Sequence, residues 1–126
     1  MVTDNKNMQL QGLRGATTSE ENTIEAIKSA VNELVFELVN RNNLPPKQIV
    51  SITFSVTADL NAWFPAAVAR QQPGWENVAL IDCQQMAVEG DLDYCIRILA
   101  IAWLPFEQIP QHPYLGLAKK LRPDRA

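Results

Sequence analysis

Isolated arginines are the residues of this sequence with the clearest chemical potential. Arg14 lies between two glycines in GLRGATT (residues 12–18), Arg97 interrupts an apolar stretch at residues 95–103, and Arg122 precedes a proline. A guanidinium stays charged and binds carboxylates through paired hydrogen bonds, so these positions indicate a site for an anionic ligand. Two structural interpretations stay open: a turn residue for Arg14, and a water-facing strand residue for Arg97.

The sequence lacks the patterns of covalent and metal catalysis. It has one histidine, no cysteine pair at metal-ligand spacing, no phosphate-binding glycine loop and no nucleophile elbow. The net charge of -3, from 11 basic and 14 acidic residues, gives no indication of a nucleic acid or anionic membrane partner. We therefore expect neither a metal nor a cofactor, and a few placed cations to bind the ligand.

The length and composition predict a single domain over residues 1–126. A chain of 126 residues with 47% hydrophobic content can form one compact core. The polar residues 1–9 show no periodicity, so we expect a flexible leader there and structure from about Leu10. Cys83 and Cys95 lie in apolar stretches without an export signal, which predicts reduced, buried thiols and a cytoplasmic protein.

An amphipathic pattern from residue 24 to residue 38 predicts one long helix. Its apolar positions are Ile24, Ile27, Val31, Leu34, Val35 and Leu38. Thr18 with Glu21 fits a capping box before this helix, and Thr23 is a second candidate cap. The helix should end near residues 42–43, because asparagine tolerates the left-handed conformation and two prolines follow.

The remaining patterns predict three strands and two short helical pieces. The alternation in VSITFSV (residues 50–56) places Val50, Ile52, Phe54 and Val56 on one face of a half-buried strand. Further strands are predicted at residues 78–81 and 95–103, the second central in its sheet or covered on both faces, and helical turns at 65–71 and 115–121. The fold class is α+β, with one sheet backed by a long helix and a short one.

Four segments together resemble the small trimeric chorismate mutases. They are GLRGATT (12–18), TADLNAWFPAAVAR (57–70), VEGDLDYCIR (88–97), and HPYL followed by LRPD, which ends at Asp124. Their order and spacing match that family over almost the whole chain after residue 10. The resemblance implies a mixed sheet in a trimeric pseudo-barrel, with active sites between neighbouring subunits of a homotrimer.

The implied reaction is the rearrangement of chorismate to prephenate in aromatic amino-acid biosynthesis. Chorismate already contains every atom of the product, so the enzyme needs only to hold a dicarboxylate in a chair-like pose and stabilise separating charge. No nucleophile, general base or cofactor is required.

The resemblance also implies roles for individual residues. Arg97 matches the arginine that faces the ether oxygen and a carboxylate, and Arg14 the one that orients the ring-side acid system and hydroxyl. Tyr114 matches a tyrosine that contacts a substrate carboxylate. Other matched substrate-binding positions are Phe64, Ala66 and Arg70, with Phe64 and Arg70 from a neighbouring subunit, together with Leu80, Ile81, and the tail residues Leu121 and Arg122. For His112 we expect only a turn or surface role.

One departure from the family concerns a catalytic carboxylate. The family usually has a glutamate where this sequence has Gln85, and Asp82 occupies the position three residues earlier, where a cysteine is common. Residues three apart on a strand face opposite sides, so Asp82 can replace the glutamate only if the chain bends. We expect a bend near Cys83. The alternative is that Gln85 serves through its own carbonyl.

Two further departures and two alternative functions remain. Ala67 stands where members can carry a lysine, and the tail after Arg122 is short. Gln85 favours a non-catalytic module that binds an aromatic carboxylate with the same fold. An imine-hydrolysing trimer of similar architecture would also use an arginine, but the four ordered segments oppose it.

Overall fold

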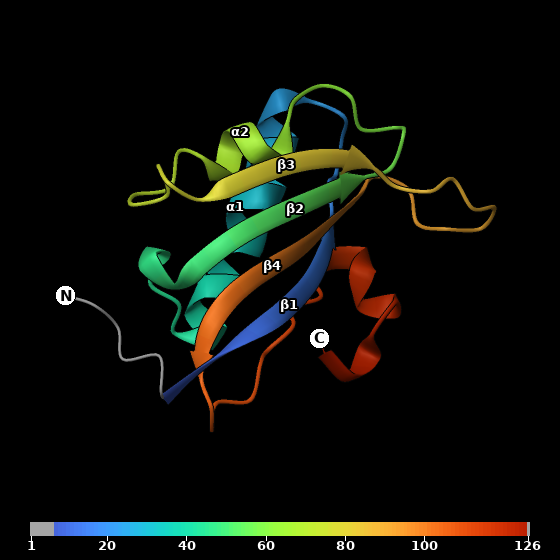
Figure 1. Cartoon of the computed structure of the whole chain (residues 1–126). Coiled ribbons are helices and arrows are strands. Elements are labelled where there is room, and N and C mark those ends of the chain that lie inside the picture. The colour runs from blue at the N-terminus through green and yellow to red at the C-terminus, as the bar shows by residue number, and fades with distance from the viewer. Residues whose placement is uncertain (1–6, 126) are drawn as a thin grey trace.

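The computed structural model describes residues 7–125, which contain one mixed four-stranded sheet (Figure 1). Its strands are β1 (Met8–Thr18), β2 (Ile49–Val56), β3 (Ala79–Gln84) and β4 (Cys95–Pro105), in the spatial order β1-β4-β2-β3. β4 pairs antiparallel with β1 and β2, whereas β2 and β3 are parallel. The predicted α+β class and the central position of β4 are confirmed.

Both α-helices lie on one face of the sheet. The long helix α1 (Ile24–Asn42) begins at Thr23, whose side chain accepts a hydrogen bond from the N–H of Ala26 at 3.1 Å. It ends at Asn43, which has the left-handed conformation (φ 47°). The other predicted cap is wrong: Thr18 is the last residue of β1, and its hydroxyl accepts from the N–H of Leu117. The short helix α2 (Pro65–Ala69) starts with a proline in its first turn.

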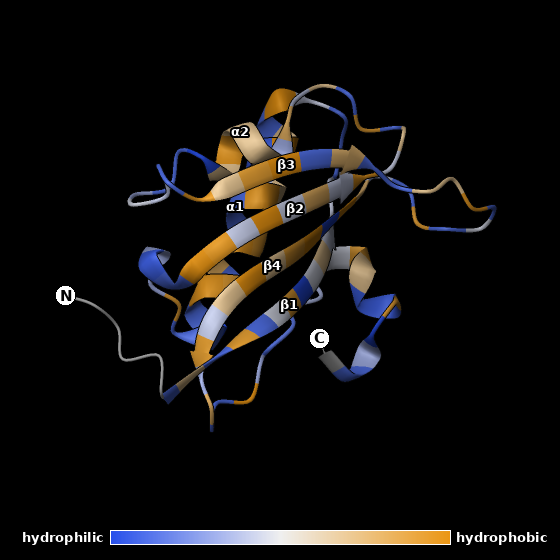
Figure 2. Cartoon of the chain, viewed as in Figure 1, coloured by the Kyte–Doolittle hydropathy of each residue, from blue (hydrophilic) through white to orange (hydrophobic). Residues whose placement is uncertain are grey.

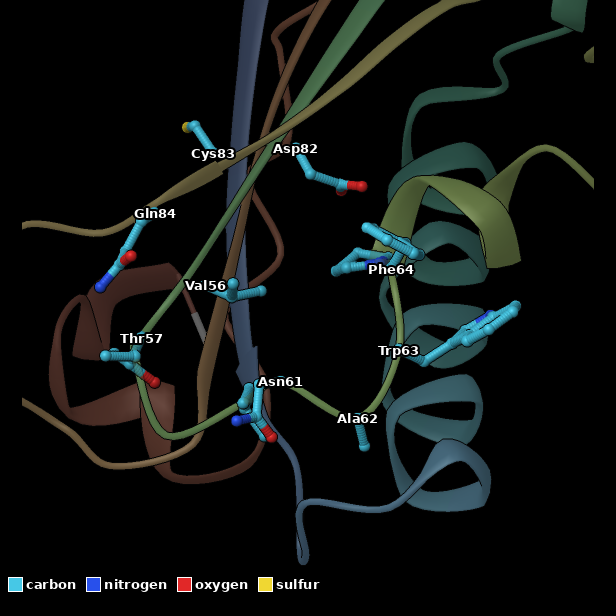
Figure 3. Close-up of a pocket in the computed structure, with 12 residues that line it drawn as sticks. Val56, Thr57, Asn61, Ala62, Trp63, Phe64, Asp82, Cys83 and Gln84 are labelled. Atoms are coloured by element: carbon cyan, nitrogen blue, oxygen red, sulfur yellow. The ribbon is translucent and has the colours of Figure 1, made fainter.

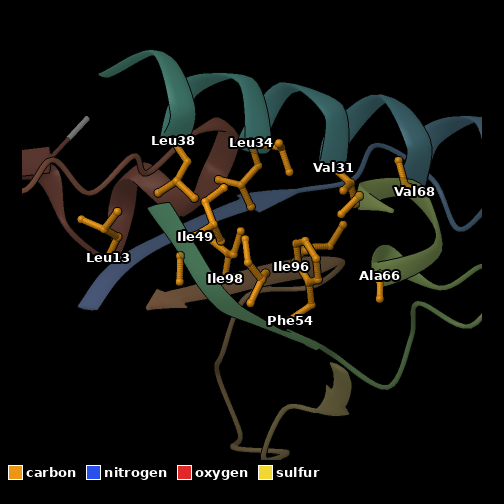
Figure 4. Close-up of a cluster of buried hydrophobic side chains, with 14 of the residues drawn as sticks. Leu13, Val31, Leu34, Leu38, Ile49, Phe54, Ala66, Val68, Ile96 and Ile98 are labelled. Carbon is orange, nitrogen blue, oxygen red and sulfur yellow. The ribbon is translucent and has the colours of Figure 1, made fainter. Parts of the chain in front are cut away.

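The core lies between α1 and the sheet (Figure 4). Leu34 and Leu38 of α1 are fully buried against Ile52 and Phe54 of β2 and Ile96 of β4. Apolar residues recur along α1 and along β4 (Figure 2). Burying one such side chain contributes about 2 kcal/mol, so this layer fixes which face of each strand turns away from the helices.

The first strand, β1, is absent from the sequence prediction. Its glycines and glutamines have low strand propensity, and its eleven residues gain their order from pairing with β4 over the full length. Met8 and Gln9 belong to this strand, which corrects the proposed leader 1–9. Residues 1–6 of that leader lie outside the described residues.

Other strand predictions need smaller corrections. A register shift between Ile49 and Ser51 leaves Val50 45% exposed and buries Ile49, so Val50 does not share the face of Ile52. β3 extends to Gln84, beyond the predicted end at residue 81. Cys95 is buried as predicted, but Cys83 is exposed. In residues 7–125, no helix is both long and apolar enough to cross a membrane.

Candidate active site

The strand register places Arg14 and Arg97 on the face of the sheet opposite α1. Arg14 pairs with Leu99, and Arg97 pairs with Ala16 on one side and Ser55 on the other. Paired residues share a face of the sheet, and successive residues along a strand alternate between faces. Leu13 is buried on the helix side, so its neighbour Arg14 lies on the opposite face, together with Arg97. The structural interpretation of Arg14 as a turn residue is wrong, because Arg14 lies within β1.

A cavity of about 220 Å³ lies between these two arginines. The residues around it are Arg14, Gly15, Thr53, Ser55, Arg97, Ile98, Leu99 and Tyr114. Among residues 7–125, no side chain forms an ion pair or hydrogen bond with the Arg14 guanidinium. The cavity therefore offers two cations and a phenol to a small anion.

Tyr114 reaches the cavity because its segment docks along β1. The N–H of Ala16 donates to the carbonyl of Pro113 at 3.0 Å, and the N–H of Leu115 donates to Ala16 at 2.8 Å. His112 has more than a turn role, since its Nδ1 accepts the N–H of Arg14 at 2.9 Å. Backbone bonds thus connect the tyrosine directly to the strand that carries Arg14.

Arg97 has one anionic partner within the chain. Its Nη2 lies 3.1 Å from Oδ1 and 3.3 Å from Oδ2 of Asp91, while its Nε is buried without a hydrogen-bond partner among the described residues. The sequence analysis missed Asp91. Its only signal was an acidic residue beside Gly90, in the same segment as Arg97 (residues 88–97) but six residues earlier.

Gln85 approaches the arginine face through Ser55. The hydroxyl of Ser55 donates to Oε1 of Gln85 at 2.9 Å, and the backbone N–H of Gln85 donates to Val56 at 2.7 Å. Because Ser55 is the register partner of Arg97, this amide lies beside the arginine cavity. This position is consistent with the expectation that Gln85 replaces the glutamate of the resembled family, with a neutral amide in place of a carboxylate.

Asp82 lies on the other face of the sheet. It pairs with Phe54, which is buried against the helices, and its Oδ1 accepts the N–H of Ala66 at 3.0 Å. Figure 3 shows it pointing toward α2 and Cys83 pointing away. The expected bend near Cys83 is wrong, because β3 stays paired with β2 to Gln84. Within one chain, Asp82 therefore does not face Arg97.

The surroundings of Asp82 also affect its ionisation. Burial raises the pKa of this carboxyl above the ordinary aspartate value, and the Ala66 hydrogen bond and the charge of Arg70 oppose that rise. A cavity of about 400 Å³ lies here, between β3 and the segment that leads into α2. Asp82 and Phe64 both line it (Figure 3).

The other predicted site residues are divided between the two faces. Phe64 and Arg70 are exposed at the two ends of α2, and Ala66 is buried within it. Leu80 is half-buried toward the helices, whereas the exposed Ile81 shares the arginine face. Leu121 packs near Tyr114, and Arg122 pairs with Asp124 at 2.9 Å. The chain thus carries two separate groups of predicted site residues, one on each face of the sheet.

Comparisons with known proteins agree on one family. The family model "Chorismate mutase type I" matches residues 10–125. Chorismate mutase AroH of Bacillus subtilis is 38% identical over 119 residues, covering 93% of both chains. Chorismate mutase AroH of Thermus thermophilus is 39% identical, covering 91% of this chain and 95% of its own. A solved chorismate mutase from Clostridium thermocellum superposes with a TM-score of 0.81 at 36% identity, covering 87% of this chain and 98% of its own.

Proposed function

The chain belongs to the type I chorismate mutase family and is an isomerase that converts chorismate to prephenate, and we propose that its active site is shared between two subunits of a homotrimer. The observation that carries the site proposal is the cavity between Arg14 and Arg97. Those two guanidinium groups match the charge of a dicarboxylate, and Tyr114 adds a hydroxyl donor beside them.

The rearrangement requires stabilisation of the charge that develops on the ether oxygen and positioning of the substrate. As the ether bond breaks, negative charge grows on its oxygen, and Arg97 stabilises that charge with a preorganised donor. Arg14 and Tyr114 bind the acidic groups and hold the substrate in its reactive pose. Gln85, hydrogen-bonded to the cavity residue Ser55, contributes a neutral amide next to this cavity.

The second half of the site comes from a neighbouring subunit. Phe64 and Arg70 lie at the ends of α2, on the helix side of the sheet, so a single subunit does not bring them to Arg97. The opposite face exposes Leu10 (52%), Leu99 (42%) and Ile81 (61%), an apolar surface that contact with another subunit would cover. Both features support the homotrimer.

The neighbouring half also provides Asp82. In this arrangement Asp82, Ala66 and Leu80, which lie on the helix side of the sheet, face the substrate held by another subunit's arginines, whereas Ile81 lies on the arginine face of its own subunit. Asp82 would accept the ring hydroxyl there. Leu121 and Arg122 lie near Tyr114 and close the cleft on the arginine side.

We also propose a cytoplasmic location. Cys83 and Cys95 are both free thiols, which is the state expected in a reducing compartment.

The direct test is turnover of chorismate by the purified protein. We expect loss of the ultraviolet absorbance of chorismate and appearance of prephenate, at a rate that a chelator does not change. No turnover above the uncatalysed reaction, at any substrate concentration, would refute the enzymatic function and leave a carboxylate-binding module.

Mixed trimers test the shared site. Arg14→Ala and Arg70→Ala subunits should each form impaired trimers, because each removes a cation from one half of every site. When the two variants are co-expressed in equal amounts, about a quarter of the sites should be intact. In these sites the Arg70→Ala subunit provides Arg14 and the neighbouring Arg14→Ala subunit provides Arg70.

Arg14→Ala mixed with Arg97→Ala is the matched control, because both residues belong to the same half and no intact half is recovered. Equal recovery in both mixtures would contradict the shared site. Full activity of Arg70→Ala alone would remove Arg70 from it, and light scattering that gives a mass of 14.1 kDa for active protein would contradict the trimer.

A further inference from the structure

Asp91 forms an ion pair with the guanidinium of Arg97. One nitrogen, Nη2, lies 3.1 and 3.3 Å from the two carboxylate oxygens. The Arg97 side chain is 32% exposed and that of Asp91 20%, so solvent screens this pair less than a pair on the open surface. The contact leaves Nε as a buried donor without a partner among the described residues.

We infer that Asp91 is a positioning residue for Arg97, which fixes Nη2 so that the remaining guanidinium donors are ready for the ether oxygen and carboxylate of the substrate. It also supplies the negative charge beside Arg97 that Gln85, a neutral amide, does not. This inference rests on the proposed function, because it assigns a role within that same site.

The loop around Asp91 is built to hold its carboxylate in place. The N–H of Asp91 donates to Val88 at 3.1 Å, and its Oδ1 accepts the N–H of Leu92 at 2.8 Å. Gly90 has φ 86°, a conformation that L side chains rarely adopt, and it turns the chain just before Asp91. The carboxylate is therefore oriented before Arg97 approaches it.

A second anchor fixes the end of the loop. Tyr94 has φ 50°, and its N–H donates to Oδ2 of Asp59 at 3.0 Å. Asp59 also accepts from the hydroxyl of Thr57, and that hydroxyl accepts the N–H of Cys95 at 3.0 Å. These contacts join the loop to the start of β4, two residues before Arg97.

The other carboxylates near this loop have different hydrogen-bond partners, are exposed to solvent, or lie on the other face of the sheet. Asp59 accepts hydrogen bonds from Tyr94 and Thr57, and Asp82 lies on the helix side of the sheet. Glu89 and Asp93 are on the same loop, but both are exposed. Among residues 7–125, only Asp91 forms a salt bridge with Arg97. The charge that balances this arginine within the subunit is therefore Asp91.

Loss of the Asp91 charge should affect kcat and KM differently. Without Asp91 the guanidinium can rotate, and a misplaced donor stabilises the transition state less. The substrate is itself a dianion, so loss of a nearby negative charge also removes repulsion. We therefore expect Asp91→Asn to lower kcat by about tenfold or more, with KM unchanged or reduced.

The experiment compares Asp91→Asn with Asp93→Asn, measuring kcat and KM with chorismate. Asparagine at position 91 keeps an oxygen for the N–H of Leu92, but it removes the negative charge and replaces one of the two oxygens that accept from Arg97 with an NH2 group. Asp93 is exposed on the same loop, so its variant carries the same change in net charge and should behave as wild type. Asp91→Asn is then repeated in an Arg97→Lys background, where its effect on kcat should largely disappear.

Three results would overturn the inference: a kcat for Asp91→Asn within twofold of wild type or above it, an equal loss in Asp93→Asn, or an undiminished loss in the Arg97→Lys background. In each of these cases wild-type turnover leaves the proposed function intact. Absence of turnover by the wild-type protein would instead refute the proposed function, and this inference with it.

Discussion

Arg97→Ala should lower kcat at least about 100-fold and change KM much less, as removal of one preorganised oxyanion donor does in other enzymes. The reason is that charge on the ether oxygen develops mainly in the transition state, so the lost interaction contributes little to binding of the ground state. In the structure Arg97 lines the cavity, and its Nε is buried without a hydrogen-bond partner among residues 7–125. Steady-state kinetics with chorismate measure both constants.

Arg97→Lys tests whether charge alone is enough. Lysine keeps a positive charge but lacks the planar set of donors with which arginine contacts Asp91 and would contact the substrate, so this variant should also be impaired, though less than Arg97→Ala. Circular dichroism and light scattering would check that both variants still fold and assemble. Near-normal kcat in either variant would remove Arg97 from the reaction.

Parts of the fold with strong local signals could be predicted from the sequence. Helix α1 has an apolar repeat, a threonine cap and an asparagine at its end, and each of these features is found where expected. Strand β1 has no such local signal. Gly12 and Gly15 disfavour a strand, and only the pairing with β4, more than eighty residues away, makes it one.

The candidate site also contains residues that the sequence indicated and one that it did not. Arg14 and Arg97 could be identified because a cation in apolar or glycine-rich sequence needs an explanation, and the family resemblance gave one. Asp91 could not be identified, because Glu89 and Asp93 are equally acidic neighbours. The turn at Gly90 decides which carboxylate reaches Arg97, and that depends on three-dimensional geometry.

Asp82 shows how an assumption about backbone shape changes a site assignment. Strand alternation alone places it opposite Gln85, and only the supposed bend near Cys83 brought the two together. Pairing with Ser55 and Val56 keeps β3 regular to Gln84. A single chain also gives no direct information on the subunit interface, where residues of the two faces would meet.

Gly15→Ala should disturb the site as strongly as the loss of a side chain that contacts substrate. A methyl group at Gly15 would lie 2.6 Å from the carbonyl oxygen of Pro113 and 3.2 Å from side-chain atoms of Ile98 and Pro113. Backbone at this distance has to move, which costs about 1–3 kcal/mol and shifts the segment that carries Tyr114. We expect a lower Tm and a clear loss of kcat/KM.

Gly12→Ala is the matched control on the same strand. A methyl group there would meet only Leu99 and Ile101 side-chain atoms, at 3.8 and 3.9 Å, which is ordinary contact. Because Gly12 lies on the face proposed to contact a neighbour, light scattering on both variants separates lost assembly from a displaced Tyr114. Similar losses of Tm and kcat/KM in the two trimeric variants would contradict the tight contact at Gly15, whereas a selective loss in Gly15→Ala would support it.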